Sequence, residues 1–349
     1  MIEVITNRQE WNAELDRIGA VDFYHTYSYH QLSKREEELP VLLKYNEGQS
    51  VIFLPLLLRN IENSEYKDAT SVYGYCGILA QNIDPNFKKD NFYRALNTFL
   101  NKTKIIAVFT RLHPYIDEAE FMLQNLGQIT SLGKVVYIDL SKTLEEQRAS
   151  YNRRLKTYIN KARKLCTVIE GTTEEHLDIF ISLYHENMRR IEATDDYFFD
   201  TDYYRQLLTS DDYEASLLMC KHNATGEIIA GAIFIKSGNI IQYHLSGLNH
   251  LYFDLQPIKL IIDEMRIQGT LQGYHYLNLG GGKGSEEDSL FEFKAKFSKD
   301  VKIFKIWKYI VNKDAYKALS ESHLQTELKS EDLDKGFFPK YRAPLKSLS

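Results

Sequence analysis

Lys294 is the residue of this sequence whose surroundings best suit it to chemistry. It stands in SLFEFKAKFS (residues 289–298), where Leu290, Phe293 and Phe297 recur at helical spacing. Packing of that apolar face would hold the lysine in place, and an immobilised ammonium can stabilise an oxyanion or a leaving phosphate. Phe293 is a candidate substrate contact on the same helix. The alternative is a surface lysine, since lysine is mostly exposed in folded proteins.

A run of glycines precedes this helix. Its members are Gly280, Gly281, Gly282 and Gly284. Glycine lets a ligand approach the backbone closely, which makes Gly281 and Gly282 candidate substrate-binding residues. Ser285 stands three residues before Asp288, a spacing typical of a capping box at a helix start. The acids at 286–288 suit an amine substrate better than a bare phosphate. The alternative is a turn with no role in an active site.

Residues 148–164, RASYNRRLKTYINKARK, contain seven basic side chains and no acidic one. We expect one long helix here, running from an N-cap at Ser141 to about Lys164. An apolar stripe recurs at helical spacing, whereas Arg153 and Lys156 fall on another face. A one-sided basic helix can bind the phosphates of a nucleotide-linked substrate or of tRNA. The alternative is a solvated charged face, which is common on helices.

Two further segments place polar side chains where a ligand can bind. In IIQYHLSGL (residues 240–248), strand alternation puts Gln242 and His244 on one face and Tyr243 on the other. His244 is a candidate base, or else a hydrogen-bonded residue of the core. Between residues 184 and 204, Arg189 stands among tyrosines and acids. This segment either binds a polar ligand or forms a solvated surface.

The overall composition narrows the class of protein. The net charge is −5 at pH 7, so tRNA would have to bind at a local basic patch. The N-terminus is polar and charged, and the longest apolar run, residues 51–58, is far shorter than the ~20 residues of a membrane span. Three scattered cysteines without zinc-ligand spacing predict reduced thiols and no metal site. We therefore expect a cytoplasmic protein without a transmembrane segment.

The expected elements predict an α/β or α+β fold with mixed sheets. Residues 40–45 and 50–59 are expected to pair as a hairpin around an Asn-Glu-Gly turn. Further strands, expected at 104–111, 135–140 and 303–311 among others, are interspersed with helices. A length of 349 residues suggests about two domains, and we expect their boundary near residues 140–143. Motifs of hydrolases, metalloproteases, deaminases and kinases are absent from the sequence.

Several of these segments together resemble the Fem-type transferases of the GNAT superfamily. VYIDLSKTLEEQRASYNRRLKTYINKARK resembles the opening of that family's second domain, and QYHLSGLN followed by PIKLIIDEMRIQGTLQGYHYLNLGG resembles its final strand, helix and strand. SLFEFKAKFS is similar to the family's Phe-Lys-x-x-Phe ending. The resemblance covers roughly residues 135–311. HTYSYHQLSK and DATSVYGYCGIL are similar to segments of the first domain.

The resemblance implies tandem GNAT-like domains with a shared cleft, at 1–142 and 143–302. It also implies that 303–349 returns to complete the first domain. Family members move an aminoacyl group from tRNA onto an amine of a peptidoglycan precursor, and others in polysaccharide clusters are thought to acylate amino sugars. By resemblance, Lys294 acts at the reacting carbonyl. Lys34, Arg189 and Tyr243 correspond to substrate-binding positions.

The expected function is therefore a transferase that forms an amide on a nucleotide- or lipid-linked cell-envelope precursor. No tightly bound cofactor is expected, and the donor is either aminoacyl-tRNA or acyl-CoA. The Q/RxxGxG/A phosphate loop of acetyl-CoA-binding GNAT domains is absent, because HLYFDLQPIKLI stands in its place. Two alternatives remain: an acetyl-CoA-dependent sugar N-acetyltransferase, and a GNAT-derived binding module without activity.

Overall fold

The expected hairpin forms near the N-terminus of the computed structural model, which describes residues 1–19, 21–83, 87–326 and 336–344. Strands β2 (Leu39–Glu47) and β3 (Ser50–Asn60) pair antiparallel along the whole of β2 and residues 50–58 of β3. Gly48 between them has a φ of 61°, a left-handed conformation that glycine adopts without steric cost. Most side chains of both strands are buried, which explains the nearly continuous apolar run of β3.

The chain folds as two compact units. Unit 1 comprises residues 1–18, 29–132 and 304–349, and unit 2 comprises residues 19–28 and 133–303. The division falls within two strands, β7 (Gln128–Asp139) and β13 (Val301–Ile310). Unit 2 therefore takes a short segment from the N-terminal part of the chain, and unit 1 takes its last strand and helix from the C-terminal part.

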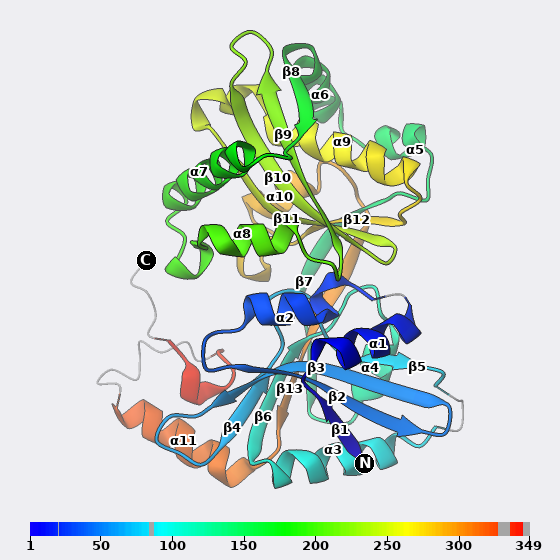
Figure 1. The fold of residues 1–349 in the computed structure, drawn as a ribbon, viewed down its shortest axis with the longest axis vertical. Coiled ribbons are helices and arrows are strands. Elements are labelled where there is room, and N and C mark those ends of the chain that lie inside the picture. Colours follow the sequence, from blue (N-terminus) through cyan, green and yellow to red (C-terminus); the bar gives the residue numbers. More distant parts are fainter. Residues whose placement is uncertain (20, 84–86, 327–335, 345–349) are drawn as a thin grey trace. The chain divides into compact units, whose positions relative to one another are not determined.

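The sheet of unit 1 has the order β1-β2-β3-β4-β6-β13, with β5 pairing to β3 (Figure 1). The expected pairing of the last strand is confirmed, because residues 306–310 of β13 run antiparallel to β6. The other strands are β1 (Ile2–Ile5), β4 (Lys67–Thr70), β5 (Leu79–Gln81) and β6 (Ile105–Arg111). The α-helices are α1 (Arg8–Ile18), α3 (Lys89–Lys102), α4 (Glu118–Leu123) and α11 (Lys313–Thr326), with α2 (Tyr27–Ser33) at the junction with residues 19–28.

The strands of unit 2 form mixed sheet in the order β7-β12-β11-β10-β9-β8. β11 and β12 are parallel and are connected by α9, whereas the neighbouring pairs are antiparallel. The strands are β8 (Cys166–Glu170), β9 (Glu214–His222), β10 (Ile228–Ser237), β11 (Ile240–Leu248) and β12 (Tyr276–Gly280). The α-helices are α5 (Leu144–Ala149), α6 (Arg153–Leu165), α7 (Glu174–Arg190), α8 (Thr201–Leu208), α9 (Pro257–Leu271) and α10 (Ser289–Lys294), and the 3-10 helices include η1 (Phe23–His25) and η3 (His250–Leu255). The expected mixed α/β fold is thus confirmed.

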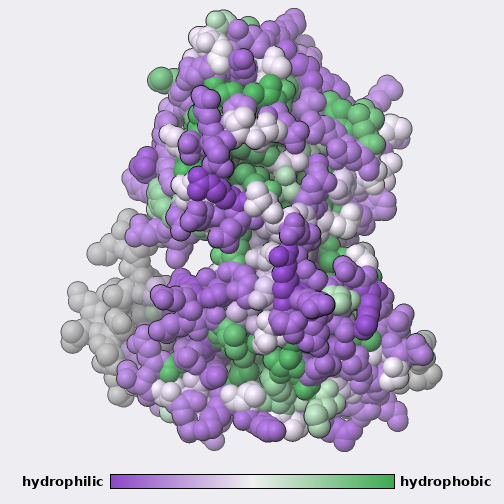
Figure 2. Space-filling view, viewed as in Figure 1, coloured by the Kyte–Doolittle hydropathy of each residue, from purple (hydrophilic) through white to green (hydrophobic). Residues whose placement is uncertain are grey.

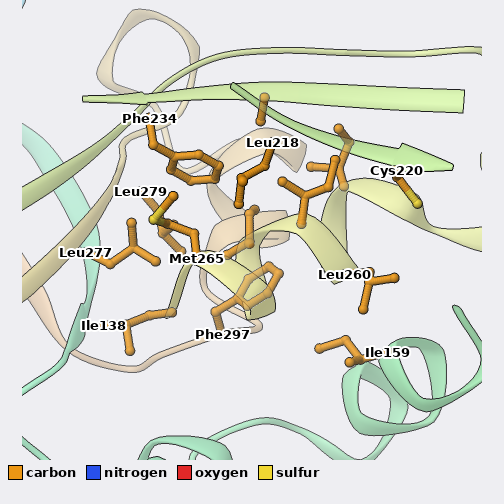
Figure 3. Close-up of a cluster of buried hydrophobic side chains, with 14 of the residues drawn as sticks. Ile138, Ile159, Leu218, Cys220, Phe234, Leu260, Met265, Leu277, Leu279 and Phe297 are labelled. Carbon is orange, nitrogen blue, oxygen red and sulfur yellow. The ribbon is translucent and has the colours of Figure 1, made fainter. Parts of the chain in front are cut away.

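Helices cover both faces of this sheet (Figure 1). On one face, Ala230, Ala232 and Phe234 of β10 pack with residues of α6 and α9 in a buried cluster. On the other face, Phe180 of α7 approaches Gly231 so closely that a Cβ there would lie 2.8 Å from its ring. In Figure 3, Met265 and Phe297 point into the cluster between the strands and Ile159 of α6. Alternate residues of each strand therefore face different helices, as the pleat requires.

The expected long helix at residues 141–164 is wrong, because the chain forms two shorter helices. Thr143, not Ser141, is the N-cap of α5, and it forms a capping box with Glu146. Asn152 then starts α6 anew, its side-chain oxygen accepting a hydrogen bond from the backbone N–H of Leu155 at 2.7 Å. An asparagine that caps a new helix interrupts the preceding one, which the charge pattern alone did not reveal.

Candidate active site

Lys294 lies at the end of α10 and is buried, with 8% of its surface exposed. Its Nζ donates a hydrogen bond to the backbone oxygen of Gly281 at 2.6 Å. Burial lowers the pKa of the Lys294 ammonium to about 8, although the carboxylate of Asp288 opposes that shift. Lys294 is therefore not the surface lysine of the alternative interpretation. An ammonium has three donors, and one of them is engaged with Gly281.

The helix face around Lys294 differs from the expected one. Leu290 is exposed by 43%, and Phe291 is buried in its place, on the same side of α10 as Lys294. Asp288 is the N-cap of α10 and accepts a hydrogen bond from the N–H of Phe291 at 2.9 Å. This cap fixes where the helix begins and therefore which residues turn inward. Phe293 is partly buried against the core cluster and lies 5.8 Å from the ring of Phe297.

The glycine run forms a tight loop between β12 and α10. Gly280 has a φ of 79°, and a Cβ there would lie 3.3 Å from the Nζ of Lys294. A Cβ on Gly281 would lie 2.8 Å from a backbone oxygen of β7, and one on Gly282 would lie 2.3 Å from Oδ1 of Asp288. All three glycines are thus needed for the chain's own packing. Their contact with a substrate stays a prediction.

The acids that follow the glycines are largely occupied. Asp288 is the helix cap, and Glu287 forms an ion pair with Lys134 at 2.7 Å. Backbone hydrogen bonds, above all the one from Phe291, lower the pKa of the Asp288 carboxyl. The expected capping role of Ser285 is wrong, because Ser285 itself has a φ of 72° and Asp288 is the cap.

Lys259 is a second buried lysine of unit 2, which the sequence patterns did not single out. It lies in the first turn of α9, is 5% exposed and donates a hydrogen bond to Gln256. Its Nζ stands 4.4 Å from the ring centroid of Tyr158 and 5.9 Å from that of Phe293. Burial, together with the positive charges of Lys296 and Arg154, lowers its pKa to about 8. Among the described residues no carboxylate pairs with Lys259.

The basic side chains of α6 divide between structural contacts and solvent. Lys156 is half-buried and donates to the backbone oxygen of Ala149, at the end of α5. Arg163 is paired with two acids of α9, Asp263 at 2.8 Å and Glu264 at 3.1 Å. Arg153 is exposed, and within the described ranges its guanidinium has neither a hydrogen-bond nor an ion-pair partner. The two residues expected to bind phosphate therefore have different surroundings.

His244 and Tyr243 face different sides of β11, as the alternation predicts. The ring of His244 lies edge-on to Phe23 at 5.4 Å, and burial lowers its pKa to about 4. This imidazole is neutral at neutral pH and is a weak base. Tyr243 packs against Phe234 at 5.6 Å, beside the core cluster of unit 2, and its hydroxyl donates to Ser246.

The remaining two candidates lie away from this loop in the chain. Arg189 is exposed in the last turn of α7. The pKa of His185 is lowered mainly by burial and, to a smaller extent, by the positive charge of Arg189. Lys34 belongs to unit 1, is half-buried and follows the last residue of α2. Of the predicted site residues, Lys294, Gly281, Gly282 and Phe293 thus lie together in the loop and α10, where Lys259 also reaches the ring of Phe293.

Neither a metal-binding cluster nor a membrane-spanning helix occurs in the part of the chain that the structure describes. No group of three or more His, Cys, Asp and Glu side chains is placed to hold a metal ion. Among the described helices, none combines the length and the apolar character that crossing a bilayer needs. Figure 2 shows a mainly hydrophilic face with smaller hydrophobic areas between the polar groups.

Comparisons with known proteins agree with the fold. Residues 147–294 match the sequence model of the acetyltransferase (GNAT) domain. The solved structure of FemX superposes with a TM-score of 0.72 at 14% identity, covering 90% of this chain and 99% of FemX. No curated protein sequence matches this chain.

Two further solved structures share the fold. A conserved protein of unknown function from Bacteroides thetaiotaomicron has a TM-score of 0.55 at 12% identity, covering 88% of this chain and all of that one. The C-terminal domain of a putative lysylphosphatidylglycerol synthetase from Agrobacterium fabrum has a TM-score of 0.51 at 12% identity, covering 91% and 96%. The expected resemblance to Fem-type proteins is confirmed at the level of fold. Residues 147–294 thus match the GNAT domain model, and the chain shares the fold of FemX over nearly the full length of both chains.

Proposed function

We propose that this protein is an acyltransferase that forms an amide by moving an aminoacyl or acyl group onto an amine of a cell-envelope precursor. The observation that carries the proposal is the buried ammonium of Lys294, held at the glycine loop inside a GNAT-type domain. The likeness to FemX and to a domain of a putative lysylphosphatidylglycerol synthetase supports an envelope acceptor, either nucleotide-linked or lipid-linked.

The reaction needs no nucleophile from the protein. The amine nitrogen of the acceptor attacks the donor's ester or thioester carbonyl and forms a tetrahedral intermediate with a negatively charged oxygen. The C–O or C–S bond then breaks, the leaving alcohol or thiol takes up a proton, and the amine nitrogen loses one. Lys294 supplies a fixed positive charge to the developing oxyanion, and the enzyme supplies proximity between the two substrates.

The function is tested by detecting the amide product. The purified chain is incubated with aminoacyl-tRNA or acyl-CoA as donor and with a nucleotide-linked amino sugar or a peptidoglycan peptide as acceptor. We expect a mass increase of one acyl group on the acceptor, stable to hydroxylamine, which cleaves esters and thioesters. Binding of these ligands without product from any donor would instead favour a binding module, and product from acetyl-CoA with an amino sugar would favour the N-acetyltransferase.

Phosphate groups of the substrate are proposed to bind at the cations around Lys259. The positive charges of Lys296 and Arg154 help to lower the pKa of Lys259, and within the described part of the chain no acid lies among the groups that shift it. Lys259 also stands in the first turn of a 15-residue helix, where the peptide dipoles favour an anion over a cation. A bound phosphate would offset both unfavourable interactions.

Removing two of these charges is expected to weaken the binding of inorganic pyrophosphate. The variant Arg154→Ala/Lys296→Ala should raise the Kd about tenfold at low salt, and the difference should shrink as salt screens the remaining charges. Wild-type binding should also weaken as the pH rises through about 8, where Lys259 loses its proton. Titration calorimetry across a salt series measures both effects.

Two variants of α6 serve as comparisons for this experiment. Lys161→Ala removes an exposed charge of the same helix and should leave the Kd nearly unchanged. Arg153→Ala/Lys156→Ala tests the site predicted from the sequence. If that pair weakens pyrophosphate binding more than Arg154→Ala/Lys296→Ala does, the phosphate binds along the outer face of α6 and not at Lys259.

A further inference from the structure

Strand β12 ends in an irregularity directly before the loop that holds Lys294. The pairing of β12 with β7 shifts register between Asn278 and Gly280, so the regular strand geometry stops there. Leu277 and Leu279 point into the core cluster, which turns Asn278 to the opposite face of the sheet. Gly280 leaves the strand with a φ of 79°. Bulges of this kind re-aim the chain and are frequent beside active sites.

A chain of hydrogen bonds leads from this irregularity to a carboxylate from the N-terminal part of the sequence. The N–H of Gly280 donates to Oδ1 of Asn278 at 3.2 Å, and Nδ2 of Asn278 donates to Oε1 of Gln242 at 2.7 Å. Nε2 of Gln242 in turn donates to Oδ2 of Asp22 at 2.5 Å. Gln242 and Asn278 are direct neighbours across the parallel pair β11–β12.

The carboxylate of Asp22 determines which group donates and which accepts in each of these three hydrogen bonds. Oδ2 of Asp22 accepts the bond from Nε2 of Gln242, so Gln242 presents its NH₂ group to Asp22. Its oxygen then faces Asn278, which must donate, and the oxygen of Asn278 is left to accept from Gly280. Neither amide can turn over without losing a bond, and an unpaired buried polar group costs ~1–3 kcal/mol. The hydrogen bonds that begin at Asp22 therefore determine the orientation of the Gly280 N–H in the loop.

The three side chains of this hydrogen-bond series are almost completely buried. Asp22, Gln242 and Asn278 are 2%, 2% and 1% exposed. The segment that supplies Asp22 is anchored to unit 2 on both sides of it, by a bond from Ser237 to the oxygen of Val21 and by one from the N–H of Ser28 to Asp212. Apolar side chains would fill such positions without the risk of unpaired groups, so two buried amides that are each bonded at both ends indicate a requirement for exact orientation.

We propose that Asp22, Gln242 and Asn278 are positioning residues, which orient the Gly280–Gly281 backbone and through it the ammonium of Lys294. The last link is the bond from Lys294 to the oxygen of Gly281, one residue beyond the N–H that Asn278 holds. The inference rests on the proposed function for its kinetic readout. The placement of the amine can be measured without any substrate.

The test replaces Asn278 by an apolar side chain of similar size. Asn278→Leu should lower kcat about 10²-fold with little change in KM, because small displacements of a catalytic group have effects of that order. It should also change the environment of the amine. The rate of Lys294 acetylation by acetic anhydride, followed against pH by peptide mass spectrometry, should show its pKa moving from about 8 towards 10.5.

Gln147→Leu is the matched control for this experiment. Gln147 is likewise a buried amide of unit 2, but it bonds to Lys142, Thr270 and Arg266 and not to the Lys294 loop. It should lower stability without moving the labelling profile of Lys294. If Asn278→Leu does not fold, Gln242→Met breaks the same chain one link earlier. An unchanged labelling profile in a folded variant overturns the inference, even if no substrate is ever found. A shifted profile supports it independently of the proposed function.

Discussion

Lys294→Met is expected to lower kcat of the proposed amide-forming reaction by about 10²–10³-fold, the loss that follows removal of one oxyanion donor. Methionine keeps most of the buried volume, whereas alanine would also open a cavity beside Gly280. KM should change little, because the ammonium acts on charge that develops only in the transition state. Lys294→Arg should restore little activity, since a planar guanidinium does not fit where a Cβ on Gly280 would already lie 3.3 Å from the amine.

The pH dependence separates two roles for this amine. If the ammonium stabilises an oxyanion, kcat should fall as the pH rises through about 8, where Lys294 loses its proton. If the neutral amine acts as a base, kcat should rise over the same interval. The same profile recorded for Lys294→Met contains the titration of the acceptor amine alone, so the ratio of the two profiles isolates the contribution of Lys294. Near-wild-type turnover by Lys294→Met would refute the catalytic assignment altogether.

Asp263→Asn is expected to lower the free energy of unfolding by about 3–5 kcal/mol, the range found when one partner of a buried ion pair is removed. Asp263 is fully buried in α9, and its carboxylate is bonded to Arg266 at 3.0 Å and to Arg163 at 2.8 Å. The hydroxyl of Tyr151 donates to it as well. Asparagine keeps the shape but leaves the buried guanidinium of Arg266 without a countercharge.

Glu264→Gln is the neighbouring control, because Glu264 is paired with the same Arg163 but is partly exposed. Glu264→Gln should lower the free energy of unfolding by less than ~1 kcal/mol, because partly solvated ion pairs contribute little to stability. Urea unfolding followed by circular dichroism measures both variants, with the transition of unit 2 fitted separately if the two units unfold in distinct steps. Equal effects of the two substitutions would mean that the buried carboxylate of Asp263 contributes no more to stability than the partly exposed one of Glu264.

The sequence predicted those elements well that depend only on neighbouring residues, such as a turn or a run of apolar side chains. The Asn-Glu-Gly turn between residues 40–45 and 50–59 indicated the β2–β3 hairpin, and the strand expected at 303–311 corresponds to β13. Helix phase was less predictable, because it depends on which residue forms the cap. Asn152 and Asp288 each restart or position a helix, and each changed which side chains turn inward.

The candidate site was only partly visible in the sequence for a different reason. Lys294 stands in a motif and next to glycines, so spacing alone was enough to single it out. Asp22 reaches the same unit from more than 200 positions away along the chain, and its bond to Gln242 joins residues that no local pattern relates. No sequence pattern singled out Lys259, because its burial among aromatic rings and other cations depends on the folded structure.

The interleaving of the two units along the chain has a consequence for synthesis on the ribosome. Residues 19–28 emerge early, but the strands on which they pack follow more than a hundred residues later. Strand β6 emerges long before β13, its antiparallel neighbour, and until then one edge of β6 lacks that partner. Neither unit can therefore be completed before residues beyond 300 have left the exit tunnel, and the nascent chain must keep an open sheet edge from pairing with other chains in the meantime.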